Sequence, residues 1–587
     1  KDPADLYTRM AYVRENHWKL THLLNYNQTF YKHDIGMLLG FEEERFVKRT
    51  TDTAKLGLID SSVGDSSSAT TPSSIGGTGE EFTSRSYFGR INYAFDSRYL
   101  FEVNMRYDGS SRFAPDNRWG LFPSFSAGWR ISEERFMKGL PIDNLKLRAS
   151  WGKLGNNAIG NYEWQAVYNS AKYAFGGSLN NGLAITSISN NLLEWESTAI
   201  TNIGIDFATL RNRLTFEAEF YNKVTDGILY RPDMYMSLGT ASGPRQNIAE
   251  VTNRGIEMTL NWQDRIGKVE YRVSGNFAYN QNKVSKYKGE LQRGWVTDEN
   301  GNRVYQTNIG DVSTGGSTRV IEGKMINEYY MLQPYKGSGN GFNADGTVNI
   351  NGGPRDGMIR TVDDMKWLNA MVGAGYKFYP RQNVSKSGIW YGDYIYADLN
   401  GDGVYGNDAD NEFQGCSNVP KYNFGLQASA NWKGFDFSMN WSGAAGFKIY
   451  YYRLALNSSA TIKGYAIGEA IANDHYFFDP KNPNDPRTNL SSKNPRLTNN
   501  SGNDQSGMTQ SSVHLQKGDY IKLKNLTIGY TLPAVLSKKV YAQNIRFFAS
   551  GENLFTITGY EGMDPEMRTA VGYSTMRQYA FGVNITF

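Results

Sequence analysis

The 587-residue sequence has one cysteine, Cys416, and only five histidines. A single cysteine excludes a disulfide framework and any CxxC metal or redox pair. The histidines form no HExxH motif or comparable pair, so a zinc centre is not expected. No GxSxG elbow and no Ser/His/Asp arrangement stands out either. These absences predict that the protein is not an enzyme.

Long apolar runs and blocks of like charge are also missing. No stretch approaches the ~20 apolar residues that a membrane-spanning helix requires. The 62 Lys and Arg residues are interspersed with 58 Asp and Glu residues, for a net charge of +4. Because no basic stripe forms, nucleic acid is not an expected partner.

Aromatic residues and glycine are abundant: the chain has 39 Tyr, 30 Phe and 62 Gly, and aromatics make up 14% of it. In the last eleven residues, large apolar side chains alternate with Gln, Ala, Gly, Asn and Thr. They are Tyr579, Phe581, Val583, Ile585 and Phe587. Strand side chains alternate between faces with period two, and ~9–11 residues span a bilayer when the strand is tilted. The segment is therefore interpreted as a membrane-spanning strand, the alternative being an edge strand of a soluble sandwich.

The same alternation recurs at Arg98–Asp108, Asn144–Trp151 and Glu270–Asn280. Charged residues on the second face suit a hydrated lumen and would be costly in lipid. They include Glu102, Arg106, Lys146 and Arg148. Rings near the strand ends suit interfacial aromatic belts. They include Tyr99, Tyr107, Trp151 and Tyr271. The recurrence predicts an all-β protein, a transmembrane antiparallel β-barrel of a bacterial outer membrane.

Counting such segments over 1–587 gives about sixteen strands. They are expected near 6–14, 17–29, 33–46, 82–95, 98–111, 118–131, 144–155, 193–208, 211–226, 247–262, 269–282, 420–432, 434–446, 513–531, 544–556 and 577–587. Short connections alternate with long ones, as periplasmic turns alternate with extracellular loops. Long extracellular loops are expected near 50–81, 156–191, 227–246, 283–419 and 447–512.

Several segments resemble one family. They include Tyr87–Tyr93, Tyr107–Phe113, Leu121–Arg130, Leu147–Asn157, Asp398–Gly403, Gly518–Leu526 and Ser550–Phe555. Together they are similar to the barrel of SusC/RagA-type TonB-dependent transporters, found in Gram-negative Bacteroidota. The resemblance runs from about residue 87 to the C-terminus.

The resemblance implies a 22-stranded barrel in the cell outer membrane that contains a plug. It implies active import of oligosaccharides or peptides, driven by the TonB complex, beneath a SusD-like surface lipoprotein. Membrane lipid and lipopolysaccharide would surround the barrel. The sequence shows no plug, no TonB-box segment and no signal peptide, and has about six strands too few. It is therefore expected to be the C-terminal part of such a barrel, with the plug and the N-terminal barrel segment missing or on another chain. The alternative is a passive porin, for which sixteen strands is a usual number.

One motif favours a metal. Asp398, Asn400 and Asp402, with glycine at the sixth position and the Val404 carbonyl at the seventh, have the spacing of an EF-hand-type Ca²⁺ loop. The twelfth position, where a closing acid belongs, is Ala409, flanked by Asp408 and Asp410. The alternative is a solvated Asx turn, for which these residue types are usual. A Ca²⁺ ion here would stiffen an extracellular loop, and no organic cofactor is expected.

Cargo contacts are expected from aromatic residues on the extracellular loops, whose faces could stack on sugars or hold peptide side chains. The candidates are Trp195, Tyr329, Tyr330, Trp367, Trp390, Tyr391 and Tyr394. The same rings could instead pack loop against loop. Phe587, a terminal aromatic residue, resembles the signal that the outer-membrane assembly machinery reads in this family.

Overall fold

The computed structural model describes residues 6–58, 62, 64–187, 189–230, 245–287, 295–297, 303–305, 318–319, 322–379, 383–451, 469–497, 511–568 and 573–587. It divides into two compact units. The first comprises Lys1–Asn212 and Glu217–Arg254, and the second comprises Arg213–Phe216 and Gly255–Phe587.

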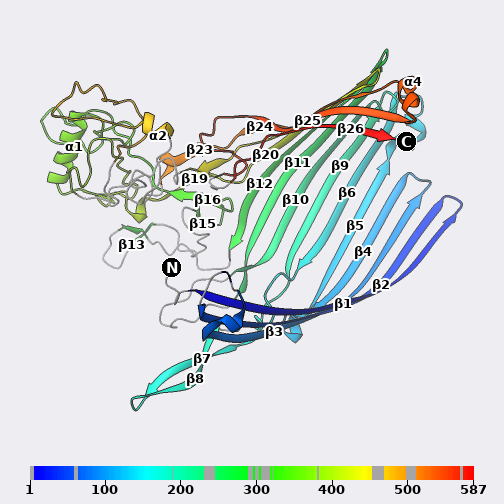
Figure 1. Cartoon of the computed structure of the whole chain (residues 1–587), viewed down its shortest axis with the longest axis horizontal. Helices are drawn as coiled ribbons and strands as arrows, with labels where there is room; N and C mark the ends of the chain where they lie inside the picture. Colours follow the sequence, from blue (N-terminus) through cyan, green and yellow to red (C-terminus); the bar gives the residue numbers. More distant parts are fainter. Residues whose placement is uncertain are drawn as a thin grey trace. The chain divides into compact units, whose positions relative to one another are not determined.

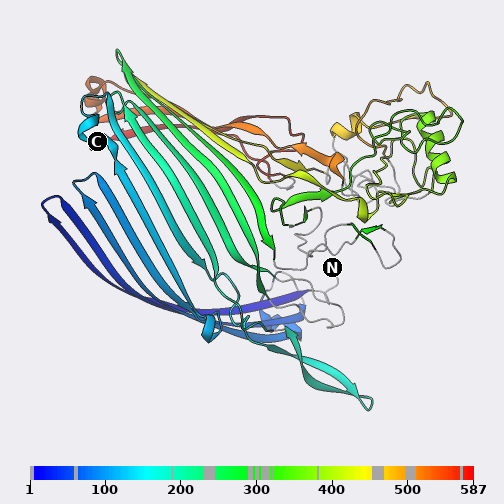
Figure 2. The ribbon, with the colours of Figure 1, turned by 180° about the vertical axis from the view of Figure 1, so that it is seen from behind.

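Among the described residues, fifteen strands form the main sheet, in the order β1-β2-β3-β4-β5-β6-β9-β10-β11-β12-β20-β21-β24-β25-β26. Figures 1 and 2 show the strands of each unit running side by side in this order. Their bounds are β1 Tyr7–Phe30, β2 His33–Leu58, β3 Ala69–Phe95, β4 Tyr99–Ser110, β5 Trp119–Arg130, β6 Ile142–Asn156, β9 Glu196–Thr209, β10 Leu214–Tyr230, β11 Gln246–Ile266, β12 Val269–Tyr287, β20 Tyr422–Trp432, β21 Phe435–Ala445, β24 Tyr520–Thr531, β25 Asn544–Thr558 and β26 Gln578–Thr586.

Smaller elements lie in the connections. They are the hairpin β7 Val167–Phe175 and β8 Ser178–Ser187, the short strands β13 Trp295–Thr297, β14 Arg303–Tyr305, β15 Thr318–Arg319, β16 Glu328–Met331, β17 Lys377–Phe378, β18 Val404–Tyr405, β19 Glu412–Ser417, β22 Lys448–Tyr450 and β23 Leu515–Lys517, and the helices α1 Val362–Gly373, α2 Glu469–Asn473 and α4 Ala534–Ser537. None of the described helices combines the length and the apolarity that crossing a membrane requires.

Short and long connections alternate along the main sheet, as the sequence predicts. One of the shortest, Lys433-Gly434 between β20 and β21, has positive φ at both residues, 48° and 89°. Two-residue hairpins favour this conformation because its twist matches the twist of the strands, and glycine adopts it at little cost. At the opposite ends of the strands, connections such as 157–195, 288–421 and 446–519 are far longer.

The two faces of the wall differ in polarity. Along β4 the apolar residues Phe101, Val103 and Met105 are exposed, while Glu102 and Asn104 between them are only half-exposed. In the sheet of a soluble protein, the large apolar side chains are less exposed than their polar neighbours, and here the pattern is reversed. This face is therefore the one compatible with lipid.

Aromatic rings mark both edges of the apolar face in the first unit. Near the long connections, Tyr107 stacks on Trp119 at 4.8 Å between ring centroids. Near the short connections, Phe95 stacks on Tyr99 at 6.4 Å. The β4 segment between Tyr99 and Tyr107 thus has an aromatic ring at each end, as expected of residues at the two membrane interfaces.

Two expectations about the first strands are wrong. The segments predicted near 6–14 and 17–29 are one strand, β1. The polar run that appeared to separate them is paired with β2, where the Lys48 ammonium contacts the Glu15 carboxylate at 2.9 Å. This continuous strand is why the main sheet has fifteen described strands and not sixteen.

The loop predicted at 50–81 is also wrong over most of its length. β2 continues to Leu58 and β3 starts at Ala69, with Thr51 in register with Gly77. A strand that has left the lipid needs only its ladder of backbone hydrogen bonds, so its sequence loses the alternating apolar pattern. The prediction relied on that pattern. Most of the predicted loop 227–246 lies outside the described residues.

The connection between β12 and β20 folds around an apolar cluster, to which Tyr476 from the connection between β21 and β24 also contributes. Helix α1 begins with a capping box between Thr361 and Asp364 and buries Trp367 and Leu368 in this cluster. Strand β19 pairs with β16 and carries the half-buried Cys416. The predicted loop 283–419 is therefore a structured region in its described parts.

The face assignment predicts an asymmetry between neighbouring positions of β4. Val103 lies midway between Tyr99 and Tyr107 on the apolar face, so Val103→Lys places an ammonium near the centre of the lipid and costs about 2–4 kcal/mol of unfolding free energy. Asn104→Lys, on the polar face beside Glu102, is expected to change it by less than ~1 kcal/mol. Urea unfolding from lipid vesicles measures both variants. Equal costs would contradict the assignment.

Candidate functional site

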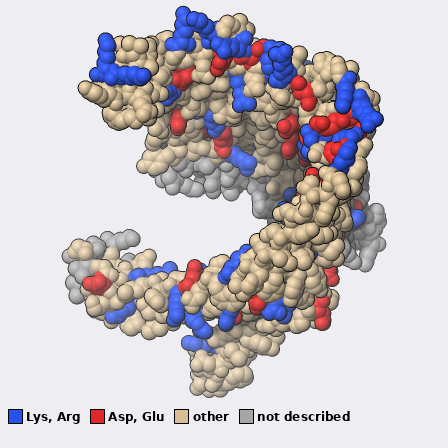
Figure 3. All heavy atoms as spheres, turned by 90° about the vertical axis from the view of Figure 1, so that its right-hand side faces the viewer, with Lys and Arg blue, Asp and Glu red and all other residues tan. Residues whose placement is uncertain are grey.

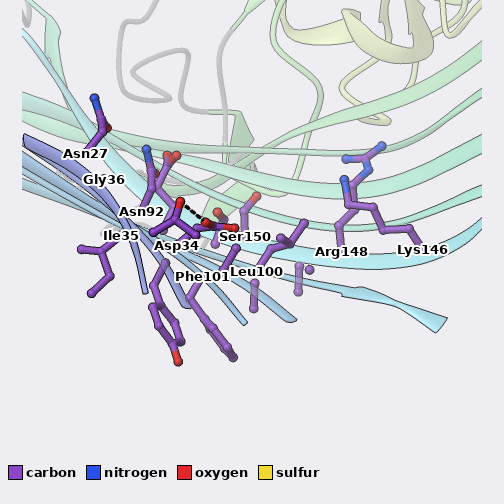
Figure 4. A pocket seen from close by; sticks show the side chains of 18 of the residues that line it. Asn27, Asp34, Ile35, Gly36, Asn92, Leu100, Phe101, Lys146, Arg148 and Ser150 are labelled. Atoms are coloured by element: carbon purple, nitrogen blue, oxygen red, sulfur yellow. Dashed lines mark hydrogen bonds between the residues drawn. The ribbon is translucent and has the colours of Figure 1, made fainter. Parts of the chain in front are cut away.

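A shallow concavity of about 650 Å³ lies on the polar face of the first unit. In Figure 4, Asn92, Lys146 and Arg148 project from one side of the sheet, whereas Ile35 and Phe101 project from the other. The dashed line marks the hydrogen bond that the Thr29 hydroxyl donates to the Asp34 carboxylate, at 2.6 Å. The lining thus offers cations, amides and carboxylates beside apolar groups such as Leu100.

Arg148 is the centre of an ion-pair network on this face. Its guanidinium donates to Asp206 on β9 at 3.0 Å and to Glu219 on β10. Lys146 lies 3.5 Å from the same Asp206. Gly204 is directly opposite Arg148, and a Cβ there would lie 2.7 Å from the guanidinium carbon. Glycine therefore lets the arginine lie flat on the wall and reach across two strands.

The second unit contains the same arrangement, in which an arginine lies over a glycine and reaches a carboxylate on another strand. Arg546 on β25 donates to Asp436 on β21 at 2.8 Å, across β24. The residue between them is Gly529, where a Cβ would lie within 2.7 Å of both side chains. Figure 3 draws the side of the short connections, where Lys and Arg gather along the upper edge with Asp and Glu among and below them. A wall of paired charges is hydrated and polar without attracting ions of one sign strongly.

The predicted cargo-binding rings are mostly buried. Trp367, Tyr391 and Tyr394 belong to the apolar cluster around α1, and Trp390 packs against it. Tyr329 and Tyr330, on β16, are also buried. Burial raises the pKa of Tyr329 and of Tyr394 to about 12. The hydroxyl of Tyr394 donates to the Lys493 carbonyl at 2.7 Å.

Trp195 lies elsewhere, in the first unit, where its indole donates to the Arg118 carbonyl at 3.0 Å and its ring contacts Phe113 and Phe122. The observed role of all seven aromatic residues is to hold connections together. Contact with cargo stays a prediction, and the buried rings have little free surface in this structure.

A buried ion pair fixes the same cluster. Arg496 donates two hydrogen bonds to Asp393, at 2.8 and 2.9 Å, and the Trp390 amide donates a third at 2.8 Å. Burial raises the pKa of the Asp393 carboxyl, and the Arg496 contact opposes that rise. The two residues are more than a hundred positions apart, so the pair joins two separate connections of the second unit.

In the Asp-rich loop, the carboxylates are engaged with the loop itself. Asp398 accepts from the Gly401 and Gly403 amides, at 2.6 and 2.9 Å, and Asp402 accepts from the Val404 amide at 2.8 Å. Asp410 accepts from three backbone amides, and burial raises its pKa to about 6 despite these bonds. The side chain of Asp408 lies outside the described residues.

The described part of the chain contains no group of three His, Cys, Asp or Glu residues that could hold a metal ion. The loop thus has the geometry of linked Asx turns, the alternative considered from the sequence. Asp398 and Asp402 each accept hydrogen bonds within the loop, and no third described His, Cys, Asp or Glu residue forms a metal-binding group with them. Calcium binding stays an untested prediction.

One cluster was not found from the sequence. The Lys522 side chain on β24 is 2% exposed, and its ammonium contacts Asp564 at 2.6 Å and Glu566 at 2.8 Å. The Thr575 hydroxyl also donates to Asp564. These contacts tie the connection between β25 and β26 to β24. The partners are about forty residues apart and only the folded register brings them together, so no local motif signals them.

Comparison with known proteins identifies the class. Residues 3–554 match the family described as TonB dependent receptor-like, beta-barrel. The chain belongs to this family. It is an all-β, outer-membrane barrel chain of a family of receptors and not of enzymes, as the sequence predicted.

A TonB-dependent receptor of Formosa agariphila is 30% identical over 96% of this chain and 52% of its own length. The TonB-dependent receptor SusC of Bacteroides thetaiotaomicron is 28% identical over 86% of this chain and 43% of its own length. Among solved structures, the RagAB peptide transporter superposes with a TM-score of 0.74 at 21% identity, covering 99% of this chain and 56% of that one. The chain spans about half the length of the curated relatives it matches.

The Lys522 cluster generates a test of the loop attachment. Lys522→Met leaves the Asp564 carboxylate buried without its cation. It is expected to lower the free energy of locally opening the connection between β25 and β26 by about 3–5 kcal/mol. Lys524→Met is the matched control, because Lys524 is more exposed and contacts Glu566 alone, so about 0–1 kcal/mol is expected. Hydrogen exchange of residues 559–568 reports the opening. Equal protection in both variants would contradict the role of Lys522.

The calcium prediction has a separate test. If the Asp-rich loop binds calcium, Ca²⁺ at about 1 mM, the range of extracellular Ca²⁺ modules, raises the unfolding temperature of the protein. Asp402→Asn abolishes the rise. Asp345→Asn, which alters another Asx turn of the same region, leaves it intact. No calcium response in the unaltered protein would leave the loop as an Asx turn alone.

Proposed function

We propose that this chain forms the barrel wall of an importer that takes oligosaccharides or peptides across the outer membrane with energy from the TonB complex. The observation that carries the proposal is the family match over residues 3–554. The wall agrees with it: an apolar outer face, and a polar inner face whose charges are paired across strands.

Two relatives support the proposed cargo class to different degrees. RagAB is described as a peptide transporter, whereas SusC is described as a TonB-dependent receptor without a stated cargo. The polar concavity bordered by Asn92, Lys146 and Arg148 offers hydrogen-bond donors and acceptors suited to hydroxyl or peptide groups. Neither chemistry is favoured over the other by these side chains.

A SusD-like surface lipoprotein is the proposed partner at the extracellular side. Support comes from the long connections, whose described parts form a folded region around α1. A plug is the proposed partner inside the wall, because a polar face of this kind suits a polar protein surface. An N-terminal barrel segment is the proposed partner of β1 and β26, the two edge strands of the main sheet. We further propose that Phe587, whose ring is exposed beside β26, acts in assembly.

The import proposal predicts energy-dependent uptake by the complete transporter. In cells that grow on the cargo, a protonophore or loss of TonB is expected to abolish uptake while surface binding persists. Planar-bilayer recording is the complementary measurement, since a plugged barrel carries no steady current. A stable open-channel conductance with uptake insensitive to the protonophore would instead identify a passive porin. Mass spectrometry of the purified assembly would name the retained cargo.

A further inference from the structure

The short connection between β24 and β25 is unusually apolar for a turn at the periplasmic side of a barrel. It contains α4 and the 3-10 turn η11 (Lys538–Val540). Four large apolar side chains are exposed on it. They are Val535, Leu536, Val540 and Tyr541, of which Val535 is 74% and Tyr541 92% exposed. Such a cluster in water is unfavourable unless something apolar covers it.

This cluster is continuous with the lipid-facing surface of the second unit. Tyr530, on the apolar face of β24, lies 4.5 Å from Phe435 between ring centroids, and Phe435 stacks on Trp432. These rings form the aromatic edge of the apolar face beside the short connections. Only three residues separate Tyr530 from the start of α4. The chain therefore stays within about 10–13 Å of the interface when α4 begins, at an extended rise of ~3.3 Å per residue.

The same connection carries two unpaired cations. Lys538 and Lys539 are exposed, and neither side chain has an ion pair or hydrogen bond with the described residues. Some cations on other periplasmic turns are paired: Lys32 contacts Asp96 at 3.1 Å and Arg213 contacts Asp264 at 3.0 Å. Basic residues without protein partners next to exposed apolar ones indicate a surface that is both negative and apolar.

The first unit contains a second connection of the same kind. Between β5 and β6, Phe136 and Leu140 are exposed, and Arg135 and Lys138 have no side-chain partner among the described residues. This segment also follows an aromatic edge residue, Trp129. The combination therefore occurs twice, in sequences that are unrelated to each other.

We propose that these two connections are binding sites for anionic phospholipid in the periplasmic leaflet of the outer membrane. The apolar side chains enter the boundary between headgroups and acyl chains, as amphipathic segments do at membrane surfaces. Lys538 and Lys539 contact lipid phosphates, and Arg135 and Lys138 do the same in the first unit. A soluble acidic partner would supply the charge but would not explain why the apolar cluster adjoins the lipid-facing rings.

Native mass spectrometry of the complete transporter, released from nanodiscs that contain phosphatidylglycerol and phosphatidylethanolamine, tests the site. Each cation near an anionic membrane surface contributes roughly a factor of five in affinity, so Lys538→Gln/Lys539→Gln is expected to weaken phosphatidylglycerol retention about 30-fold. The matched control is Lys377→Gln/Lys481→Gln, which removes two exposed lysines from the extracellular connections. It is expected to leave retention unchanged. Heat modifiability on gels confirms that each variant is folded.

A second measurement reports depth. Tryptophan introduced by Tyr541→Trp is expected to be quenched by brominated phospholipids, relative to Tyr541→Phe in the same nanodiscs. The proposal is overturned if both double variants lose lipid equally, or if phosphatidylethanolamine is retained as well as phosphatidylglycerol. It is also overturned if the tryptophan at position 541 shows no added quenching, since the segment would then face the periplasm.

Discussion

Every backbone N–H and C=O group inside a bilayer must find its partner within the protein, because hydrocarbon offers none. In this chain the partners are the neighbouring strands, and the ladder has a strict consequence. Once strands pair, side chains alternate between lipid and lumen. Whether a position needs an apolar or a polar side chain therefore depends on which face of the strand it lies on. Val103 and Asn104 differ by one position and face solvents of opposite kind. The paired charges of the inner face, including Arg148 with Asp206, follow from the same constraint.

The sequence predicted the features that depend on the alternation of side chains along a strand. It predicted little of what depends on contacts between residues far apart in the chain. The strands within the lipid were recognisable because rings and polar residues alternate there, as in Arg98–Asp108. The prediction failed where the strand leaves the bilayer: residues 50–81 are rich in Ser, Thr and Gly and lack the alternating apolar pattern, yet most of them belong to β2 and β3 and pair with each other. The same reasoning placed charged residues on the inner face but could not pair them. Arg148 and Glu219 are separated by 71 positions, and their contact depends on a register that no local pattern encodes.

The candidate rings show the other limit. An exposed-loop tryptophan and a buried one have the same sequence context when the loop folds on itself. Trp367 was expected on a surface because it lies in a connection, but the capping box at Thr361 starts a helix that turns the ring inward. The connections of this protein therefore have interiors, held by Asp393 with Arg496 and by Lys522 with Asp564. Any binding surface on them would consist of residues that stay exposed after the rings are buried.

Cys416 has a practical consequence for labelling this chain. It is the only thiol in the sequence, it is half-buried on β19, and burial raises the pKa of its sulfur. Since the thiolate is the reactive form, maleimide reagents will modify it slowly near neutral pH. A cysteine introduced at an exposed position will react first. Fluorophores or spin probes can thus be attached to a single chosen site while Cys416 is retained, and the distances between wall and connections become measurable in a membrane.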